Sequence, residues 1–465
     1  MANSESLRDE WKEEAFSLQL AAVKRASDGL RVALRSMPAL RSIVMSIDMS
    51  ISVEVNLASS HGLPGISPYF LEAILSTPQL QHLAIFGPLC HPNDVLPQDV
   101  TFHSLARLTS FNYQLEHERS VAQVSVAEKK QISLILGRVH DHLERLSVPS
   151  ACVVIDEMAI WQWPLLEELT IHGEKAPSST PLSLLLSKMP RLRFASLMLA
   201  DPAREDLPPA CHSSLDPQFL WRDLEVLSIA HPNPEDEMYA HLSHDLQELS
   251  LRCWPRHYKH QTPFRESVFT KGVQWTSPLL SSSEMLRILS KIEAPRLTVL
   301  EIEYRADSTG TQLLRHIGAA FPSLIILRIH RYRMTAQEVL PLVEIGRTLS
   351  TLQQLEVLML HLDFADLPDV KLFKRWGSLS PVGEKQLRDS DAALAQAANI
   401  MAQVLAPSLE CIFFLRPFIG GVSQWVPFRI VRTPDDQAGD RVTAIYESPH
   451  LSEIRAYRYL AQSDE

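Results

Sequence analysis

Five side chains that can bind zinc fall within one short stretch of the sequence: His241, His244, Cys253, His257 and His260. Zinc takes imidazole and thiolate ligands, and structural zinc sites arrange these ligands in closely spaced pairs. The spacing here matches no such arrangement, and a predicted strand at residues 246–251 separates the two halves of the group. We therefore expect no metal at this position.

Other motifs that would indicate catalysis are also missing. The segment His140-Asp141-His142 lacks the His-Glu-x-x-His spacing that places two ligands and a base on one helical face. The sequence contains no Gly-x-Ser-x-Gly elbow, no Walker loop and no Gly-x-Gly-x-x-Gly turn. A hydrolase whose catalytic residues are far apart in the sequence stays open as an alternative. The sequence favours a protein that is not an enzyme and that binds no cofactor.

Composition narrows the choice of partner and compartment. The 55 acidic and 44 basic residues give a net charge of −11. Proteins that bind nucleic acid neutralise its phosphates with cationic side chains, so this balance argues against nucleic acid as a partner. Five cysteines without a Cys-x-x-Cys pair fit a reducing compartment. No run of 18 apolar residues occurs, so we expect a cytoplasmic or nuclear protein, or both, that is not in the membrane.

One short pattern recurs along the chain and must supply the scaffold. It is Leu-x-x-Leu-x-Leu, with Ile, Val, Met or Phe allowed in the later places. Ten clear copies begin at Leu40, Leu80, Leu143, Leu166, Leu224, Leu246, Leu297, Leu324, Leu355 and Leu409, and weaker copies begin at Leu105, Leu192 and Leu451. Between many copies, apolar residues recur three and four apart, which is typical of amphipathic helices. Strand, turn and helix repeated in this way predict an α/β solenoid.

This core, with a helix behind each copy, resembles the leucine-rich repeat family over residues 37–457. The resemblance implies an irregular horseshoe-shaped solenoid with a parallel concave sheet and convex helices. The family's usual Asn or Cys, eight places after the first Leu, is replaced here by residues such as Asp48, Pro88 and Glu174. The irregular spacing, the prolines before several copies and the long inserts look most like the repeat region of fungal F-box proteins. No F-box is recognisable.

The first 36 residues predict one amphipathic helix. Its apolar positions recur at spacings of three and four: Leu7, Trp11, Ala15, Leu18, Ala22, Ala26, Leu30, Ala33 and Met37. The open end of a solenoid is apolar and must be covered. We interpret residues 1–36 as a cap, with a divergent adaptor-binding segment as the alternative.

Residues 37–465 are expected to form the solenoid, interrupted by inserts near 200–221, 254–280 and 362–390 and ending in a hairpin around 434–439. The second insert interleaves basic and aromatic residues, including Arg256 and Tyr258, a mixture that can bind single-stranded nucleic acid. We favour a loop folded over the convex side. An arm that contacts another protein is the third possibility.

The residues of the concave face follow from the alternation of side chains along a strand. Counting the first Leu as place 0, the apolar places 0, 3 and 5 point inward, and places 2, 4 and 6 point outward. Place 4 holds small hydroxyl side chains in six consecutive copies: Thr109, Ser147, Thr170, Ser196, Ser228 and Ser250. The candidates for partner binding are Phe86, Arg107, Phe111, Arg145, His172, Phe194, Met198, Arg252, Glu303, Arg328, His330 and His361. Aromatic residues, Arg and Met commonly anchor interfaces.

These observations predict a non-catalytic solenoid that binds a protein target on its concave face. The resemblance implies a more specific function, the substrate-recognition part of a cullin-type ubiquitin ligase, with a Skp-type adaptor as a further partner. A scaffold or regulatory protein unrelated to ubiquitin is the alternative, because it would use the same binding surface.

Overall fold

The computed structural model describes residues 18, 21–46, 66–89, 108–115, 119–175, 178, 180–200, 221–258, 275–335, 337–364, 381–416, 424–433 and 441–447. The chain divides into two compact units. Among the described residues, those up to Arg193 belong to unit 1 and those from Phe194 onward belong to unit 2. Both units are α/β, with an open and mostly parallel sheet.

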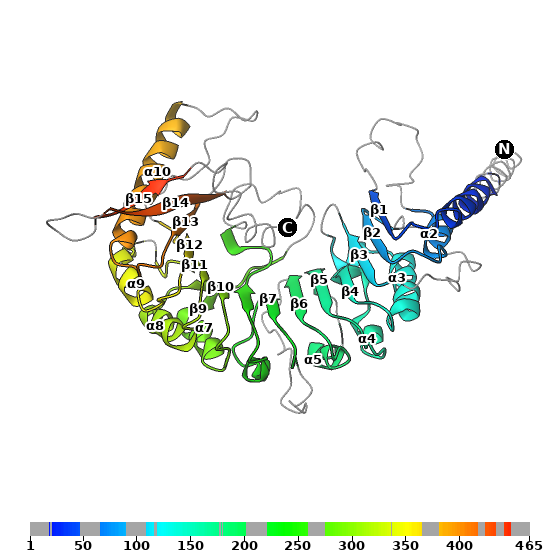
Figure 1. The fold of residues 1–465 in the computed structure, drawn as a ribbon, viewed down its shortest axis with the longest axis horizontal. Helices are drawn as coiled ribbons and strands as arrows, with labels where there is room; N and C mark the ends of the chain where they lie inside the picture. Colours follow the sequence, from blue (N-terminus) through cyan, green and yellow to red (C-terminus); the bar gives the residue numbers. More distant parts are fainter. Residues whose placement is uncertain are drawn as a thin grey trace, which may run out of the picture. The chain divides into compact units, whose positions relative to one another are not determined.

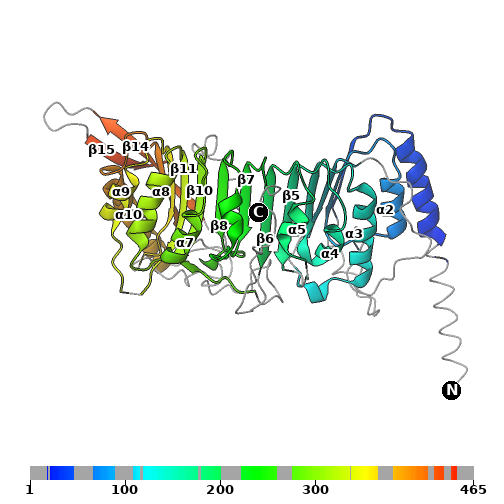
Figure 2. The ribbon, with the colours of Figure 1, turned by 90° about the horizontal axis from the view of Figure 1, so that it is seen from below.

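Unit 1 is built from parallel strands that pair in chain order (Figure 2). Its strands are β1 (Ser42–Ser46), β2 (His82–Phe86), β3 (Ser110–Gln114), β4 (Arg145–Pro149) and β5 (Glu168–Glu174). The helical segments are α2 (Pro68–Leu75), η2 (Val121–Gln123), α3 (Val126–Val139), η3 (Ser150–Cys152), α4 (Ile155–Met158) and α5 (Leu182–Leu186). The α-helices lie on one side of the sheet.

Unit 2 repeats this plan and then changes it. The parallel strands are β6 (Phe194–Ala200), β7 (Val226–Ala230), β8 (Glu248–Arg252), β10 (Val299–Arg305), β11 (Ile326–Tyr332), β12 (Val357–His361) and β13 (Cys411–Arg416), while β9 (Leu280–Ser281) pairs with the end of β10. The strands β14 (Gln424–Thr433) and β15 (Arg441–Tyr446) form an antiparallel hairpin against β13. The helical segments are η5 (Glu237–His241), α7 (Ser282–Leu289), α8 (Gly310–Ala320), α9 (Leu342–Leu349) and α10 (Pro381–Ala402). Figure 1 shows α7, α8 and α9 along one side of β10, β11 and β12.

The leucine pattern forms the core of both units. In the copy that begins at Leu297, the residues at places 0, 3 and 5 are fully buried. The strand register aligns place 3 of one copy with place 3 of the next, so that Leu300 pairs with Leu327 and Leu327 with Leu358. Burying each such side chain stabilises the fold by roughly 1.5–3 kcal/mol. The strands predicted from the ten clear copies and from the copy at Leu192 are therefore confirmed, and the copy at Leu451 lies outside the described residues.

The prolines that precede several copies occupy tight turns. Leu297 donates its amide to the carbonyl of Ala294 at 3.1 Å, and Leu324 bonds in the same way to Phe321 at 3.2 Å. In both turns the second residue is proline, whose fixed φ suits that position. The proline ends the preceding helix and directs the chain into the next strand.

One predicted register is wrong. The weak copy read from Leu105 would place Phe111 on the outer face, but Phe111 is only 1% exposed and pairs with the core residue Leu83. The strand β3 follows a copy that begins at Leu108, with Phe111 at place 3 and Tyr113 at place 5. Two aromatic side chains fill the apolar places, and Asn112 takes the outward place predicted for Thr109.

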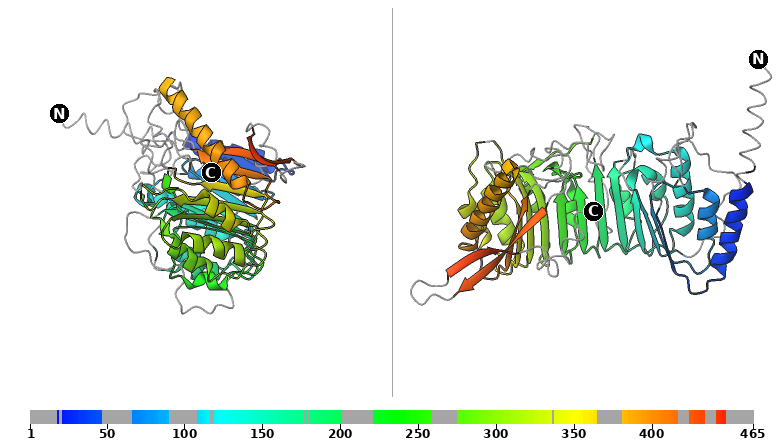
Figure 3. Two further views of the ribbon diagram at one scale, coloured as in Figure 1. Left: turned by 90° about the vertical axis from the view of Figure 1, so that its left-hand side faces the viewer. Right: turned by 90° about the horizontal axis from the view of Figure 1, so that it is seen from above.

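The N-terminal helix, residues 21–35, lies beside α2 (Figures 2 and 3). The ammonium group of Lys24 lies 4.7 Å from the centre of the Tyr69 ring, and Arg31 pairs with Glu72 at 3.7 Å. The predicted apolar side of this helix does not make these contacts. Of its described members, Leu18 and Met37 are 64% and 49% exposed. The expectation that this side covers the core is therefore wrong for the described residues.

The hairpin predicted near the C-terminus is confirmed, although its turn at 434–440 lies outside the described residues. Figure 3 shows α10 against this hairpin. Most of the three predicted inserts also lies outside the described residues. In the third insert, residues 381–390 belong to α10, which begins at Pro381. Of the helices that the structure describes, none has the length and apolar character needed to cross a membrane.

Candidate functional site

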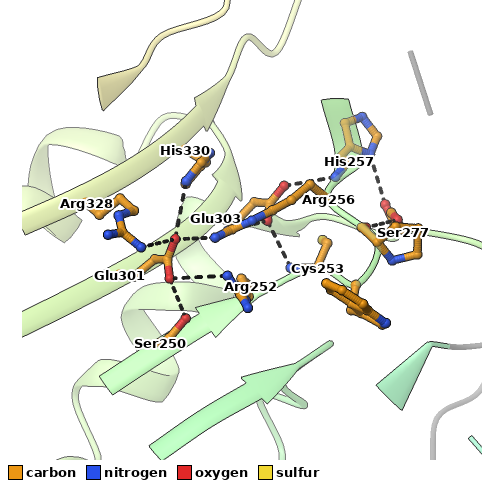
Figure 4. Close-up of polar contacts among 12 residues, drawn as sticks. Ser250, Arg252, Cys253, Arg256, His257, Ser277, Glu301, Glu303, Arg328 and His330 are labelled. Carbon is orange, nitrogen blue, oxygen red and sulfur yellow. Dashed lines mark hydrogen bonds and ion pairs between the residues drawn. The ribbon is translucent and has the colours of Figure 1, made fainter. Parts of the chain in front are cut away.

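Charged side chains gather on the face of the unit 2 sheet opposite α7, α8 and α9. It is called the helix-free face below because none of these three helices lies on it. This ionic cluster consists of Arg252, Arg256, Glu301, Glu303, Arg328 and His330 (Figure 4). Each of the six residues is between 1% and 6% exposed. Buried charges are costly unless they are paired and hydrogen-bonded, so their contacts determine what the cluster does.

The strands bring most of these residues together through their register. Glu301 and Glu303 are two residues apart on β10 and therefore point to the same face, while Ile302 between them points into the core. Glu301 pairs with Ser250 on β8 and with Arg328 on β11. Carboxylates on the central strand thus lie beside a hydroxyl on one neighbouring strand and a guanidinium on the other.

Glu303 is saturated by four donors, three from the chain segment 253–257 at the start of the second insert and one from β11. Its carboxylate accepts hydrogen bonds from the backbone amides of Cys253 at 3.0 Å and His257 at 3.1 Å. The Arg256 guanidinium donates at 3.2 Å and the Tyr332 hydroxyl at 3.0 Å. These four donors use the lone pairs of a carboxylate fully. Glu303 therefore fixes the chain segment 253–257 on the helix-free face.

Glu301 is surrounded in the same way. Arg256 donates a short hydrogen bond to its Oε1, and Arg328 Nη1 lies 3.3 Å from the same atom. Ser250 donates to Oε2 at 2.7 Å, and Arg252 Nη1 is 3.8 Å from Oε2. The Arg256 guanidinium therefore bridges both carboxylates, an arrangement that suits its planar fork of donors.

The protonation states follow from these contacts. Burial alone would raise the pKa of Glu301, but the cations around it, Arg256 foremost, hold that pKa well below its usual range. Burial would likewise raise the pKa of Glu303, but its neighbours, Arg256 foremost, lower that pKa below its usual value. Burial and then Arg256 lower the pKa of Arg252 to about 10. At neutral pH both carboxylates are therefore ionised and act as acceptors.

Aromatic rings cover one side of the cluster. His330 Nε2 lies 3.4 Å from Glu301, which is longer than a normal hydrogen bond. The Tyr258 ring stacks on His330 with centroids 6.1 Å apart and lies 5.7 Å from His361. Trp425 from the hairpin packs edge-on against His330 at 5.6 Å. Burial and then the neighbouring His330 lower the pKa of His361 to about 3.

The two ends of the second insert are joined at this place. Ser277 donates to the carbonyl of Pro255 at 2.5 Å, and the Cys253 thiol lies 3.2 Å from the carbonyl of Pro278. His257 Nδ1 lies 2.9 Å from the carbonyl of Ser277. The favoured expectation for this insert is therefore wrong for its described ends. They lie on the helix-free face, because the buried carboxylates of β10 bind the amides and the guanidinium of the insert.

The candidate zinc ligands are divided among separate environments. Cys253 and His257 contact backbone carbonyls, as described above, and His241 and His244 are exposed. His260 lies outside the described residues. In the part of the chain that the structure describes, no three His, Cys, Asp or Glu side chains are grouped as metal ligands would be.

A second buried polar group lies in unit 1. Glu128 accepts a short hydrogen bond from the Tyr113 hydroxyl. The Arg119 guanidinium forms an ion pair with the same carboxylate at 2.6 Å. The Tyr113 oxygen in turn accepts from the backbone amide of Leu89 at 3.2 Å. A backbone amide just after β2 is thereby hydrogen-bonded to a side chain from β3.

The structure sorts the residues predicted for the binding face into five groups. Phe86, His172 and Phe194 are half-buried on outward positions, and Arg145 is exposed. Six are buried on the helix-free face of unit 2: Met198, Arg252, Glu303, Arg328, His330 and His361. Phe111 is in the core, and Arg107 lies outside the described residues. The structure thus brings together the six buried candidates of unit 2, while Phe86 and His172 are separated by β3 and β4.

Two important residues were not predicted for the site. Glu301 was not selected as a candidate, and Arg256 was assigned to a loop on the opposite side. A signal for Glu301 existed in the sequence, since the aligned copies place acidic residues at 301 and 303 and basic residues at 252 and 328. Opposite charges in adjacent, aligned copies predict cross-strand pairs.

Two comparisons with known proteins find no match for this chain. A scan against protein-family models gives no match, and a search of curated proteins finds no similar sequence.

Proposed function

We propose that the protein is a non-catalytic, leucine-rich-repeat-like solenoid that binds a protein partner through the outward face of the unit 1 sheet. The observation that supports this proposal is the register of β3, β4 and β5. It aligns Asn112 with Ser147 and Ser147 with Thr170 in one half-exposed polar row. Arg145 lies toward one end of the strands, and His172 lies toward the other. A row of small polar side chains flanked by larger ones is a suitable floor for a partner.

The size of this face limits the interaction that it can make. Five strands about 4.8 Å apart, with about five residues each rising 3.3 Å, cover roughly 400 Å². A standard interface buries about 800 Å² per partner. Chain segments that flank the strands must therefore contribute about half of the contact area.

The ionic cluster has a supporting role in this proposal. Its carboxylates are occupied by donors of the same chain, so their chemistry is to hold the base of the second insert. Ordering this base before binding lowers the entropic cost of an interaction that uses the insert. Unit 1 provides the recognition floor, and the cluster stabilises the structure of unit 2.

The test is a triple substitution, Phe86→Ala with Arg145→Glu and His172→Ala. All three side chains are at least partly exposed, so we expect little loss of stability and a loss of partner capture of at least about tenfold. Partners are first identified by cross-linking mass spectrometry that maps contacts to β2, β4 and β5. The matched control is Ile160→Ala, which changes a side chain that is 76% exposed next to α4. Capture that is equal for the triple variant and the wild type would contradict the proposal.

The more specific function, substrate recognition for a cullin-type ubiquitin ligase, rests on the resemblance to F-box proteins. Purification from the source cells should then recover a Skp-type adaptor and a cullin with the chain. Reproducible recovery of other partners without either protein would favour a scaffold or regulatory function, which uses the same binding face. Hydrolytic turnover of defined substrates by the purified chain would instead support the third alternative, an enzyme with a nonlocal site.

A further inference from the structure

Two histidines on the helix-free face of unit 2 are buried without the contacts that a charged imidazole needs. His330 on β11 and His361 on β12 are in register on adjacent strands, and their ring centroids are 5.9 Å apart. They are 1% and 8% exposed. Among the described residues, no hydrogen-bond partner lies within reach of Nδ1 or Nε2 of His330 or of Nδ1 of His361. Because a protonated ring carries two N–H donors, charging either histidine here would leave a buried donor unsatisfied.

Aromatic side chains form a cover over these two rings. The Tyr258 ring, at the base of the second insert, lies 6.1 Å from that of His330 and 5.7 Å from that of His361. Trp425 on β14 packs edge-on against His330 at 5.6 Å, and Tyr332 lies 4.8 Å from His361. Tyr258 and Trp425 are only half-buried, so they are the outer layer. The apolar places of β11 and β12 point to the other face of the sheet, so this layer can move without opening the core.

Charged groups from several elements face His330. Burial is the largest influence on this ring and lowers its pKa, and Arg256 of the second insert lowers it further. Glu301 and Glu303 of β10 act in the opposite direction but do not outweigh the other two effects. Arg328, on the same strand as His330, is a further cation of the cluster (Figure 4). The ring is therefore neutral at neutral pH.

His361 is held neutral by a similar balance. Burial lowers its pKa most, and the adjacent His330 and then His257 of the second insert lower it further. Asp363, just after β12, and Glu303 of β10 raise it. The result is a pKa of about 3. A histidine in water has a pKa of about 6.5, so below this pH a released ring binds a proton that the buried ring does not.

We propose that His330 and His361 form an acid-operated latch, which releases Tyr258 and Trp425 from the helix-free face when the two rings take up protons. The closed latch resists protonation, whereas the open latch exposes both rings to water. Glu303, whose pKa is lowered, stays ionised in mild acid and keeps the base of the second insert attached. The latch therefore opens at its outer layer while the sheet beneath it stays folded.

The difference in proton affinity sets the size of the effect. A ring with a pKa of about 3 when closed and about 6.5 when open should raise the ratio of open to closed molecules roughly thirtyfold between pH 7.5 and pH 5. This figure is for His361 alone, and His330 adds to it in the same direction. Because such coupling is reciprocal, removing the cover must in turn raise the proton affinity of the rings.

Fluorine NMR of the whole chain labelled with 5-fluorotryptophan measures the release, and Trp425→Phe assigns the signal. The ratio of open to closed molecules reported by Trp425 should rise at least about thirtyfold from pH 7.5 to pH 5. The signal of Trp221, which is 5% exposed in the same unit, should keep its native position. A Trp425 signal that does not respond to pH would overturn the proposal. Signals of Trp425 and Trp221 that change together would also overturn it, since they would report unfolding of the whole unit.

His361→Phe keeps a flat ring but cannot take up a proton. The roughly thirtyfold share of His361 in the response of Trp425 should therefore disappear. His244→Gln, at an exposed position, is the matched control and should respond like the wild type. A response of His361→Phe equal to that of the control would show that another group drives the release.

Tyr258 allows the reverse test. Tyr258→Ala removes the cover, whereas Tyr258→Phe keeps its ring. Exchange of the ring C–H hydrogen that lies between the two nitrogens, followed by mass spectrometry across pH, gives the proton affinity of each histidine. The proton affinity of His361 should be at least about tenfold higher in Tyr258→Ala than in Tyr258→Phe. Equal affinities in the two variants would mean that the cover does not hold the rings neutral, and the latch would be excluded.

Discussion

The backbone amide of His257 donates a 3.1 Å hydrogen bond to the Glu303 carboxylate, although the two residues are 46 positions apart in the chain. The carboxylate belongs to a core strand, and the amide belongs to the base of an insert. The buried carboxylate of Glu303 therefore determines where the second insert leaves the sheet. The first prediction concerns this contact.

Replacing Glu303 with Gln should lower the free energy of unfolding by about 3 kcal/mol, because breaking a buried ion pair leaves Arg256 short of a counter-charge. Urea denaturation measures this loss. The amide of His257 should also exchange its hydrogen faster, since a neutral amide oxygen is a weaker acceptor. Glu293→Gln, at an exposed position, is the control. Unchanged exchange at His257 would show that Glu303 does not hold the insert.

Mild acid should destabilise unit 2 through its buried histidines. Burial, and for His330 also Arg256, lowers the pKa of His330 and His361 below the value of about 6.5 expected in the unfolded chain. The unfolded chain therefore binds protons that the native state does not, and stability falls as the pH drops below about 6.5. With a native pKa of about 3, His361 should cost about 2 kcal/mol at pH 5, and His330 should add to this loss in the same direction. Urea midpoints measured between pH 7.5 and pH 5 test this expectation.

His361→Phe should flatten this pH dependence, and His244→Gln, at an exposed position, should leave it unchanged. The carboxylates behave differently. The pKa of Glu301 is already lowered, so its contribution is present above about pH 4.3 and is lost only in stronger acid. A stability that stays constant from pH 7.5 to pH 5 would contradict the role assigned to the histidines.

The inward position of Phe111 can be checked by truncation. Phe111→Ala removes a side chain that is 1% exposed and should cost about 3–5 kcal/mol of stability. Phe86→Ala, on the outward position of the neighbouring strand, should cost about 1 kcal/mol. Equal losses in thermal or urea unfolding would mean that the register of β3 is the one first read from the sequence.

The hairpin edge depends on a side chain of α10. Asn399 Oδ1 accepts a hydrogen bond of 2.8 Å from the amide of Ala444 on β15. Asn399→Ala leaves this buried amide unpaired and should cost about 1–2 kcal/mol. Asn399→Asp keeps an acceptor and should lose less. An unpaired edge amide also invites pairing with another chain, so light scattering should show more association for the alanine variant.

The sequence was sufficient to predict the strands because each copy repeats three apolar places that only an inward face can satisfy. It was misleading at β3, where Leu105 and Leu108 both match the first place of the pattern. Only the register with Leu83 shows that the aromatic residues Phe111 and Tyr113 fill the later places. A pattern that admits tyrosine at place 5 would have found this register.

The site was harder to predict than the scaffold. The pairing of Glu301 with Arg328 depends on the alignment of two copies, which the repeat does provide. The position of Arg256 depends on the path of an insert, and its local sequence does not encode that path. The two sides of the N-terminal helix also could not be distinguished by periodicity, since Leu34 and Val32 are both apolar and only contact with α2 selects one.

The reversal of direction at β14 has a consequence for how such a chain can lengthen during evolution. From β6 to β13 the paired strands run the same way, so duplication of one coding module there would leave every neighbour correctly oriented. A module inserted between β13 and β14 would meet a strand of opposite polarity. Differences in module number among descendants of this gene should therefore arise before β13.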